Sequence, residues 1–131
     1  MDVTKIITGD REPKWFRIPT GGENEPEVLV KTPAPKKIRE ISKRAGLVNV
    51  RRFDENDLSN DRFLSDLCDY MIIDWKNIRL ELDGKVVDLP CTRENKVALM
   101  DNWIEFFSVV LDVLNASRVD AEAVLEDGRG N

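Results

Sequence analysis

Apolar residues recur at helical spacing most clearly between positions 93 and 115, where they form two neighbouring stripes. The first stripe consists of Val97, Met100, Ile104, Phe107, Leu111 and Leu114, and the second of Leu99, Trp103, Phe106, Val110 and Val113. Both stripes advance by alternating steps of three and four residues, as one face of an α-helix does. The pattern predicts a helix over 93–115, with Thr92 as its N-cap.

Two adjacent apolar stripes are wider than a single core contact requires. We therefore expect one stripe to be core and the other to be an association surface, for a second copy of the chain or for a partner helix. The residues proposed for that surface are Trp103, Phe106, Val110 and Val113. Which stripe faces inward stays open, since both are apolar, and burial of both in a central helix is the alternative.

Three further segments have patterns of regular structure. Ile38, Ile41 and Ala45 share one face of a predicted helix over 36–45. A second helix is expected to begin after a cap at Ser59, Asn60 or Asp61 and to run to about Trp75. Between 77 and 89, alternating apolar residues flank Asp83-Gly84, a pair that supplies the positive φ angles of a two-residue hairpin turn.

The expected fold class is mainly α within an α+β architecture. It has three to four helices, a small β-hairpin and short N-terminal strands near Trp15–Ile18 and Val28–Val30. Residues 1–25 are rich in turn-forming Gly, Pro and Asn and are expected to be loosely structured. Residues 26–115 are expected to form one globular domain, and 116–131 a frayed acidic tail after the last helix.

Composition narrows the classes of function. The chain contains no histidine, which removes the commonest general base and metal ligand, and no phosphate-binding glycine loop. We therefore expect no catalytic residues, no metal and no cofactor. Cys68 and Cys91 lack metal-ligand spacing and are expected to be inert thiols of a reducing compartment. The N-terminus lacks the apolar stretch of a signal peptide, and no apolar run is long enough to span a membrane.

Two sets of carboxylates invite a chemical interpretation. The cluster Asp54, Asn56, Asp57, Asn60 and Asp61 has the composition of a calcium loop. It lacks the glycine and the closing glutamate that a calcium loop requires. Solvated charge and helix capping are therefore the favoured interpretation of this cluster. Asp66 and Asp69 share one helix face, but catalysis by such a pair requires a pocket and a perturbed pKa.

A basic segment lies in the first half of the chain. Eight lysine and arginine residues fall between positions 31 and 52, where Glu40 is the sole acid. Such a segment suits phosphate, but no aromatic residue lies between 17 and 52 to stack on bases, and the whole chain has a net charge of −5. A solvated or self-complementary basic face is the preferred interpretation. A nucleic-acid-associated regulator using 36–52 is the alternative.

Residues 70–115 contain three features in a characteristic order. A predicted helix ends at Asp74-Trp75-Lys76, Asp83-Gly84 lies in a short segment, and Thr92, Glu94 and Asn95 open the last helix. In this order the segment resembles the tail assembly chaperones of long-tailed bacteriophages of the siphophage type, including those of prophages.

The resemblance implies a non-enzymatic protein of the host cytoplasm that binds the tape-measure protein and assists assembly of the tail tube. Its implied partners are the tape-measure protein and tail-tube subunits, with a homo-oligomer as a further possibility and no membrane. A tape-measure protein exposes apolar helical faces before the tube surrounds it, and a wide apolar stripe rimmed by Asp and Glu suits such a face.

Overall fold

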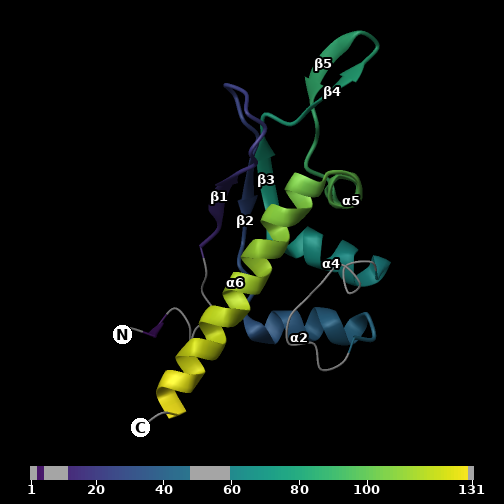
Figure 1. The fold of residues 1–131 in the computed structure, drawn as a ribbon. Helices are drawn as coiled ribbons and strands as arrows, with labels where there is room; N and C mark the ends of the chain where they lie inside the picture. The colour runs from purple at the N-terminus through teal and green to yellow at the C-terminus, as the bar shows by residue number, and fades with distance from the viewer. Residues whose placement is uncertain (1–2, 5–11, 48–59, 130–131) are drawn as a thin grey trace.

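The computed structural model describes residues 3–4, 12–47 and 60–129, with side chains described as far as residue 116. Four helices and five strands follow one another along the described chain (Figure 1). Their order is β1 (Lys14–Arg17), β2 (Glu27–Val30), α2 (Pro35–Arg44), α4 (Asp61–Met71), β3 (Ile72–Lys76), β4 (Arg79–Leu82), β5 (Lys85–Asp88), α5 (Arg93–Asn102) and α6 (Ile104–Arg129). The predicted α+β class, with its helices, hairpin and short N-terminal strands, is confirmed.

The larger sheet has three antiparallel strands in the order β1-β2-β3. Its register aligns Phe16 with Val28 and Val28 with Trp75. Because side chains alternate between the two faces of a sheet, these three residues share one face, and Val28 and Trp75 are buried there. β1 brings the segment 14–17 into this sheet, within the part of the chain that was expected to be loosely structured.

β3 corrects the predicted end of the preceding helix. The apolar periodicity favoured a helix reaching Trp75, whereas α4 ends at Met71 and the next five residues form β3. Ile72 and Ile73 are β-branched and suit an extended backbone. Pairing with β2 then provides backbone partners that residues on a helix end would lack.

The start of α4 agrees with the predicted cap. The Asn60 side chain accepts a hydrogen bond from the Phe63 backbone N–H at 3.0 Å. The same side chain donates to the Ala45 carbonyl at 3.1 Å, just beyond the end of α2. One residue therefore caps α4 and connects it to α2, against which it packs.

The helix predicted over 93–115 is two helices in the structure. Trp103 has φ −128° and ψ 101°, an extended conformation that ends α5 and precedes α6. Its N–H still donates to the Leu99 carbonyl and its carbonyl accepts from Phe107 N–H, each at 3.0 Å. The break therefore leaves both backbone groups of Trp103 bonded, and it lets α5 and α6 run in different directions (Figure 1). Periodicity alone did not reveal it, because one extended residue barely disturbs a 3.6-residue pattern.

The far end of α6 also differs from the prediction. The helix was expected to stop near residue 115, but α6 continues to Arg129. Residues 116–129 include three alanines, two glutamates and two arginines, which are strong helix formers. Their local preference outweighs the acidic composition on which the tail prediction rested.

The predicted hairpin is present as β4 and β5. Asp83 and Gly84 form its turn with φ angles of 52° and 76°, the left-handed conformations that a two-residue turn of this kind requires. Below the strands, Leu89 N–H donates to the Ile78 carbonyl at 2.9 Å and extends the ladder. Only this base is anchored in the core, through the buried Ile78 and the half-buried Leu89.

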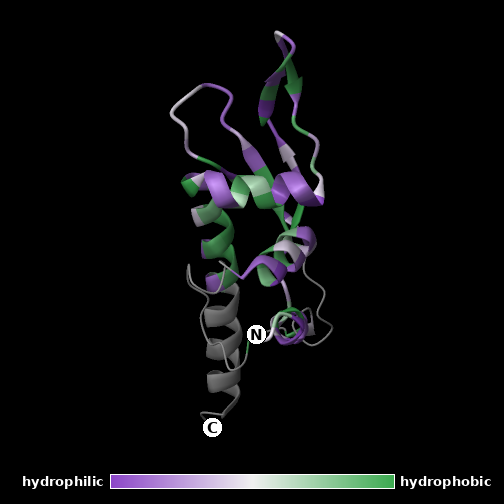
Figure 2. Ribbon diagram, turned by 90° about the vertical axis from the view of Figure 1, so that its right-hand side faces the viewer, coloured by the Kyte–Doolittle hydropathy of each residue, from purple (hydrophilic) through white to green (hydrophobic). Residues whose placement is uncertain are grey.

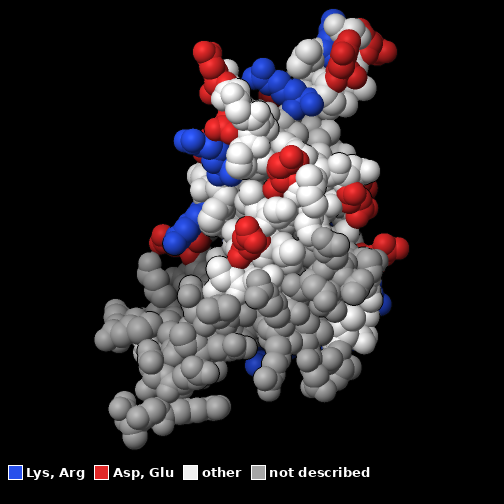
Figure 3. Space-filling model, in the orientation of Figure 1, with Lys and Arg blue, Asp and Glu red and all other residues white. Residues whose placement is uncertain are grey.

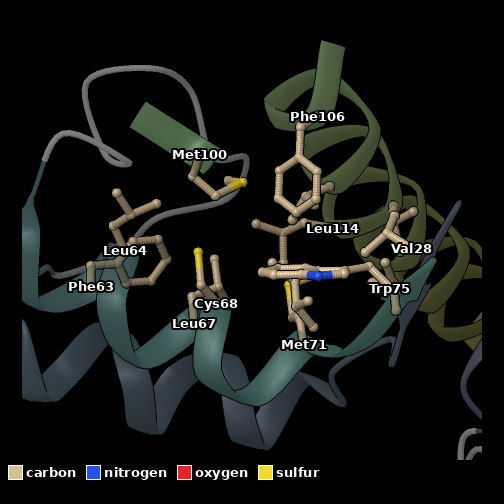
Figure 4. Packing of buried hydrophobic residues seen from close by; sticks show 14 of the residues in the cluster. Val28, Phe63, Leu64, Leu67, Cys68, Met71, Trp75, Met100, Phe106 and Leu114 are labelled. Atoms are coloured by element: carbon tan, nitrogen blue, oxygen red, sulfur yellow. The ribbon is translucent and has the colours of Figure 1, made fainter. Parts of the chain in front are cut away.

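The core lies between the three-stranded sheet and the helices (Figure 4). Trp75 of β3 is at its centre. Its ring meets Phe106 of α6 edge-on at 6.1 Å, and its indole Nε1–H donates to the Leu89 carbonyl at 2.7 Å. Met71 and Cys68 of α4 and Met100 of α5 are buried in the same cluster.

Replacing core and surface residues of α6 provides a direct test of this packing. Phe106 is fully buried, whereas Ile104 is 62% exposed. We expect Phe106→Ala to lower the free energy of unfolding by about 3–5 kcal/mol, because it removes a large side chain and leaves a cavity. Ile104→Ala is the matched control on the same helix and should change stability by less than about 1 kcal/mol. Urea denaturation followed by circular dichroism measures both, and equal losses would contradict the assignment.

Candidate partner-binding surface

The four residues predicted as a partner surface lie close together, but they face the interior. Phe106, Val110 and Val113 are buried, and Trp103 is half-buried. The Trp103 ring stacks on Phe106 at 5.8 Å, and Phe106 meets Trp75. Within the single chain, these side chains are already covered by their own sheet and helices. This placement corrects the idea that they are free to receive a partner.

The first part of the other stripe of α6 lies toward solvent, whereas Leu114 at its end is fully buried in the core. Ile104 is 62% exposed, and Phe107 and Leu111 are partly buried against the edge of the core. Met100 belongs to the same sequence stripe, yet it is buried because the break at Trp103 places it on a different helix. The exposed apolar stripe of α6 is therefore defined by Ile104, Phe107 and Leu111.

Acidic side chains border this stripe. Asp101, Glu105 and Asp112 are exposed, and no salt bridge joins any of them to a described lysine or arginine. Figure 3 shows acidic side chains spaced among uncharged atoms on the side of the molecule where α5 and α6 meet. An apolar stripe with uncompensated negative charge at its margin suits a segment that is apolar on one side and basic beside it.

The polar residues of α6 also bear on which side of this helix faces the core. Glu105, Ser108 and Asp112 recur at helical spacing, and all three are exposed. At 100° per residue their mean direction lies about 130° from that of Phe106, Val110 and Val113 and about 100° from that of Ile104, Phe107 and Leu111. These three positions favour the Phe106 side as core, although the polar Asn115 further along α6 is buried.

The paired carboxylates of α4 have a structural role. Arg93 of α5 contacts Asp66 at 2.5 Å and Asp69 at 3.6 Å, and its Nε–H donates to the Ser65 hydroxyl at 2.7 Å. The hydrogen bond that Arg93 donates to Asp66 raises the pKa of the Arg93 guanidinium. The ammonium group of Lys96, largely buried, lies 3.5 Å from an Asp69 oxygen. These ion pairs join α4 to α5 and give the two aspartates a structural role.

The basic segment is divided between contacts within the chain and exposed charge. The ammonium groups of Lys31 and Lys37 lie over the Tyr70 ring, at 5.4 and 5.0 Å from its centre. The nearby aromatic ring is thus used within the chain. The exposed basic residues of α2 are Lys36, Arg39, Lys43 and Arg44. Arg51 and Arg52, the remaining basic residues of the segment, lie outside the described residues.

Only part of the cluster that has the composition of a calcium loop lies within the described residues. Asp54, Asn56 and Asp57 lie outside the described residues. Asn60 is the cap of α4, and Asp61 is in its first turn, where a negative charge is favourable to the helix. Among the described residues no group of three or more Cys, Asp or Glu side chains is placed to hold a metal ion.

Neither cysteine is placed for nucleophilic chemistry. Cys68 is fully buried, and burial raises the pKa of its thiol from 9.0 to about 12. Burial also raises the pKa of Cys91, which is half-buried. A raised pKa keeps the thiol protonated, and the thiolate is the reactive form.

Comparison with known protein families, with curated proteins and with solved structures finds no match to this chain. None of the described helices combines the length and apolar character needed to cross a membrane.

The thiols provide a test of the packing around α4. At pH 8 we expect Cys68 to resist iodoacetamide in the folded protein and to react fully in urea, because its folded pKa is about 12. Cys91→Ala isolates Cys68, and Cys68→Ala is the matched single-thiol control, in which the half-buried Cys91 should react faster. Mass spectrometry of the alkylated protein measures both, and rapid labelling of folded Cys68 would contradict its burial.

The same shift gives the direction of a pH effect. The folded pKa of Cys68 lies above its unfolded value of 9.0. The stability associated with keeping this thiol protonated is therefore complete below pH about 9 and is lost as the pH rises toward 12. Cys68→Ala removes this dependence.

Proposed function

We propose that this chain is a non-enzymatic binding protein that covers an apolar helical segment of a partner, as a phage tail assembly chaperone does for the tape-measure protein in the host cytoplasm. The observation that carries the proposal is the exposed apolar stripe of α6, Ile104 with Phe107 and Leu111, bordered by acidic residues. A helix with an apolar face and basic margins would bury this stripe and neutralise the charge around it.

The segment that resembles tail assembly chaperones supports the proposal in part. Thr92 caps α5 by accepting a hydrogen bond from Asn95 N–H at 3.2 Å, and Asp83-Gly84 forms a tight turn. Asp74-Trp75-Lys76 departs from the pattern, because it lies within β3 rather than at the end of a helix. Support from the motif therefore rests on its second half, which leads directly into the helices that present the stripe.

The carboxylates of α4 and the two cysteines contribute to the packing of the described chain. The carboxylates of α4 are paired with Arg93 and Lys96, and both cysteines are held as thiols. Asp66, Asp69 and the two cysteines, which the sequence offered for chemistry, thus have packing or pairing roles.

A charge placed in the stripe tests the proposal. Ile104→Asp should leave the protein folded, because Ile104 is exposed, and should abolish co-purification with the tape-measure protein encoded beside it. The control Gly22→Asp adds the same charge in a turn where a new Cβ meets only Thr20 Oγ1 at 3.9 Å, and should retain the partner. Pull-down after co-expression measures both. Retention of the partner by Ile104→Asp, or a genome with no tape-measure gene near this one, would overturn the proposal.

The four exposed basic residues of α2 favour a second candidate, a nucleic-acid-associated regulator. We expect DNA binding to be weak and lost at moderate salt, because the net charge is −5 and Tyr70 is occupied by Lys31 and Lys37. Fluorescence anisotropy with duplex and single-stranded DNA at about 150 mM salt provides the measurement. Sub-micromolar affinity that disappears in Lys36→Glu with Lys43→Glu would transfer the function to this face.

A further inference from the structure

The hairpin β4–β5 extends beyond the core as a two-stranded sheet of its own (Figure 1). Leu82, Val86 and Val87 are 54%, 68% and 37% exposed, so no described part of the chain covers either face of the hairpin. Figure 2 shows hydrophobic stretches on the hairpin, which stands clear of the rest of the described chain. Two strands alone are marginally stable in water, and a further strand or a covering element would stabilise them.

The register of the hairpin determines which backbone groups are free. Leu82 is opposite Lys85, and Leu80 is opposite Val87. The bond from Leu89 N–H to the Ile78 carbonyl identifies this set as the hydrogen-bonded pairs, because such pairs alternate along an antiparallel ladder. The remaining residues, Arg79 and Glu81 on β4 and Val86 and Asp88 on β5, direct their N–H and C=O groups away from the hairpin.

The two free edges differ in their side chains. On β4 both outward-bonding residues, Arg79 and Glu81, are charged, and charge on an edge strand discourages pairing with another chain. On β5 the corresponding residues are Val86, which is apolar, and Asp88, whose carboxylate is 3.3 Å from Arg79. The β5 edge is therefore the less protected of the two.

We propose that β5 is a self-association edge, which pairs in antiparallel fashion with β5 of a second copy of this chain. A twofold axis perpendicular to the sheet places the same face of both hairpins on the same side of the joined sheet. Val87 can therefore lie directly opposite Val87 of the second copy. Val86 then pairs with Asp88 of the second copy, and Asp88 with its Val86. Both outward-bonding residues of each β5 are used, and four backbone hydrogen bonds form.

Side chains favour the same arrangement. Leu80, Leu82 and Val87 share one face of the hairpin, because Leu80 is opposite Val87 and two residues from Leu82. Pairing through β5 joins this face to its copy and makes one continuous apolar surface across four strands. The hairpin carries two basic and three acidic residues, so two copies approach without strong repulsion: Arg79, Lys85, Glu81, Asp83 and Asp88. The edge is short, so the dimer is weak and its population depends on concentration.

A pair of proline variants separates the two edges. Val86 and Glu81 are cross-strand neighbours, and neither N–H is used within the hairpin. Proline removes the N–H and is tolerated at such positions. Val86→Pro should weaken dimerisation by about tenfold or more, whereas the control Glu81→Pro should leave it unchanged. Sedimentation equilibrium over a range of concentrations measures both.

Three outcomes would overturn the proposal. They are a wild-type chain that stays monomeric up to about 1 mM, a dimer that survives Val86→Pro, and equal weakening by both prolines. Amide hydrogen exchange of the wild-type protein provides a second measurement without any substitution. Protection of the Val86 and Asp88 amides should rise with protein concentration, while the Arg79 and Glu81 amides stay unprotected. This test is independent of the stripe on α6, so either proposal can fail without the other.

Discussion

The packing of Trp75 connects parts of the chain that are far apart in sequence. Its backbone belongs to β3 and pairs with β2, its indole N–H bonds the Leu89 carbonyl at the base of the hairpin, and its ring faces Phe106 of α6. A buried indole N–H requires an acceptor, and Leu89 provides one that also holds the hairpin to the core. The orientation of the sheet, of the hairpin and of α6 thus depends on one side chain.

Local signals predicted much of this fold. The Asp83-Gly84 turn, the Asn60 cap and the Thr92 cap each depend on a few adjacent residues, and each is present as expected. The differences arise where contacts distant in sequence decide the conformation. Ile72–Lys76 is a strand because β2 lies beside it, and Trp103 leaves the helical conformation between two helices that pack in different directions. Helical periodicity contains no information about either neighbour.

The orientation of the candidate surface on α6 also depends on contacts between residues that are distant in sequence. Sequence alone identified two apolar stripes on the last helix but did not orient them. Burial of Phe106, Val110 and Val113 against Trp75 and its neighbours orients α6 and leaves Ile104, Phe107 and Leu111 on the outer side. The assignment of a partner surface therefore moved by about one residue along the helix, which is enough to rotate it by about 100°.

The two proposed surfaces are connected through Trp75, with a consequence for binding. The hairpin base is tied to Trp75, and Trp75 packs on the helix that carries the exposed stripe. A dimer formed through β5 would therefore present two copies of that stripe in one assembly. A partner with repeated apolar helical faces would engage the second stripe at a high effective concentration once the first is bound. Each stripe is small, and a single one would bind weakly. A long helical partner is the class of ligand that gains most from this geometry, because a short peptide reaches only one stripe.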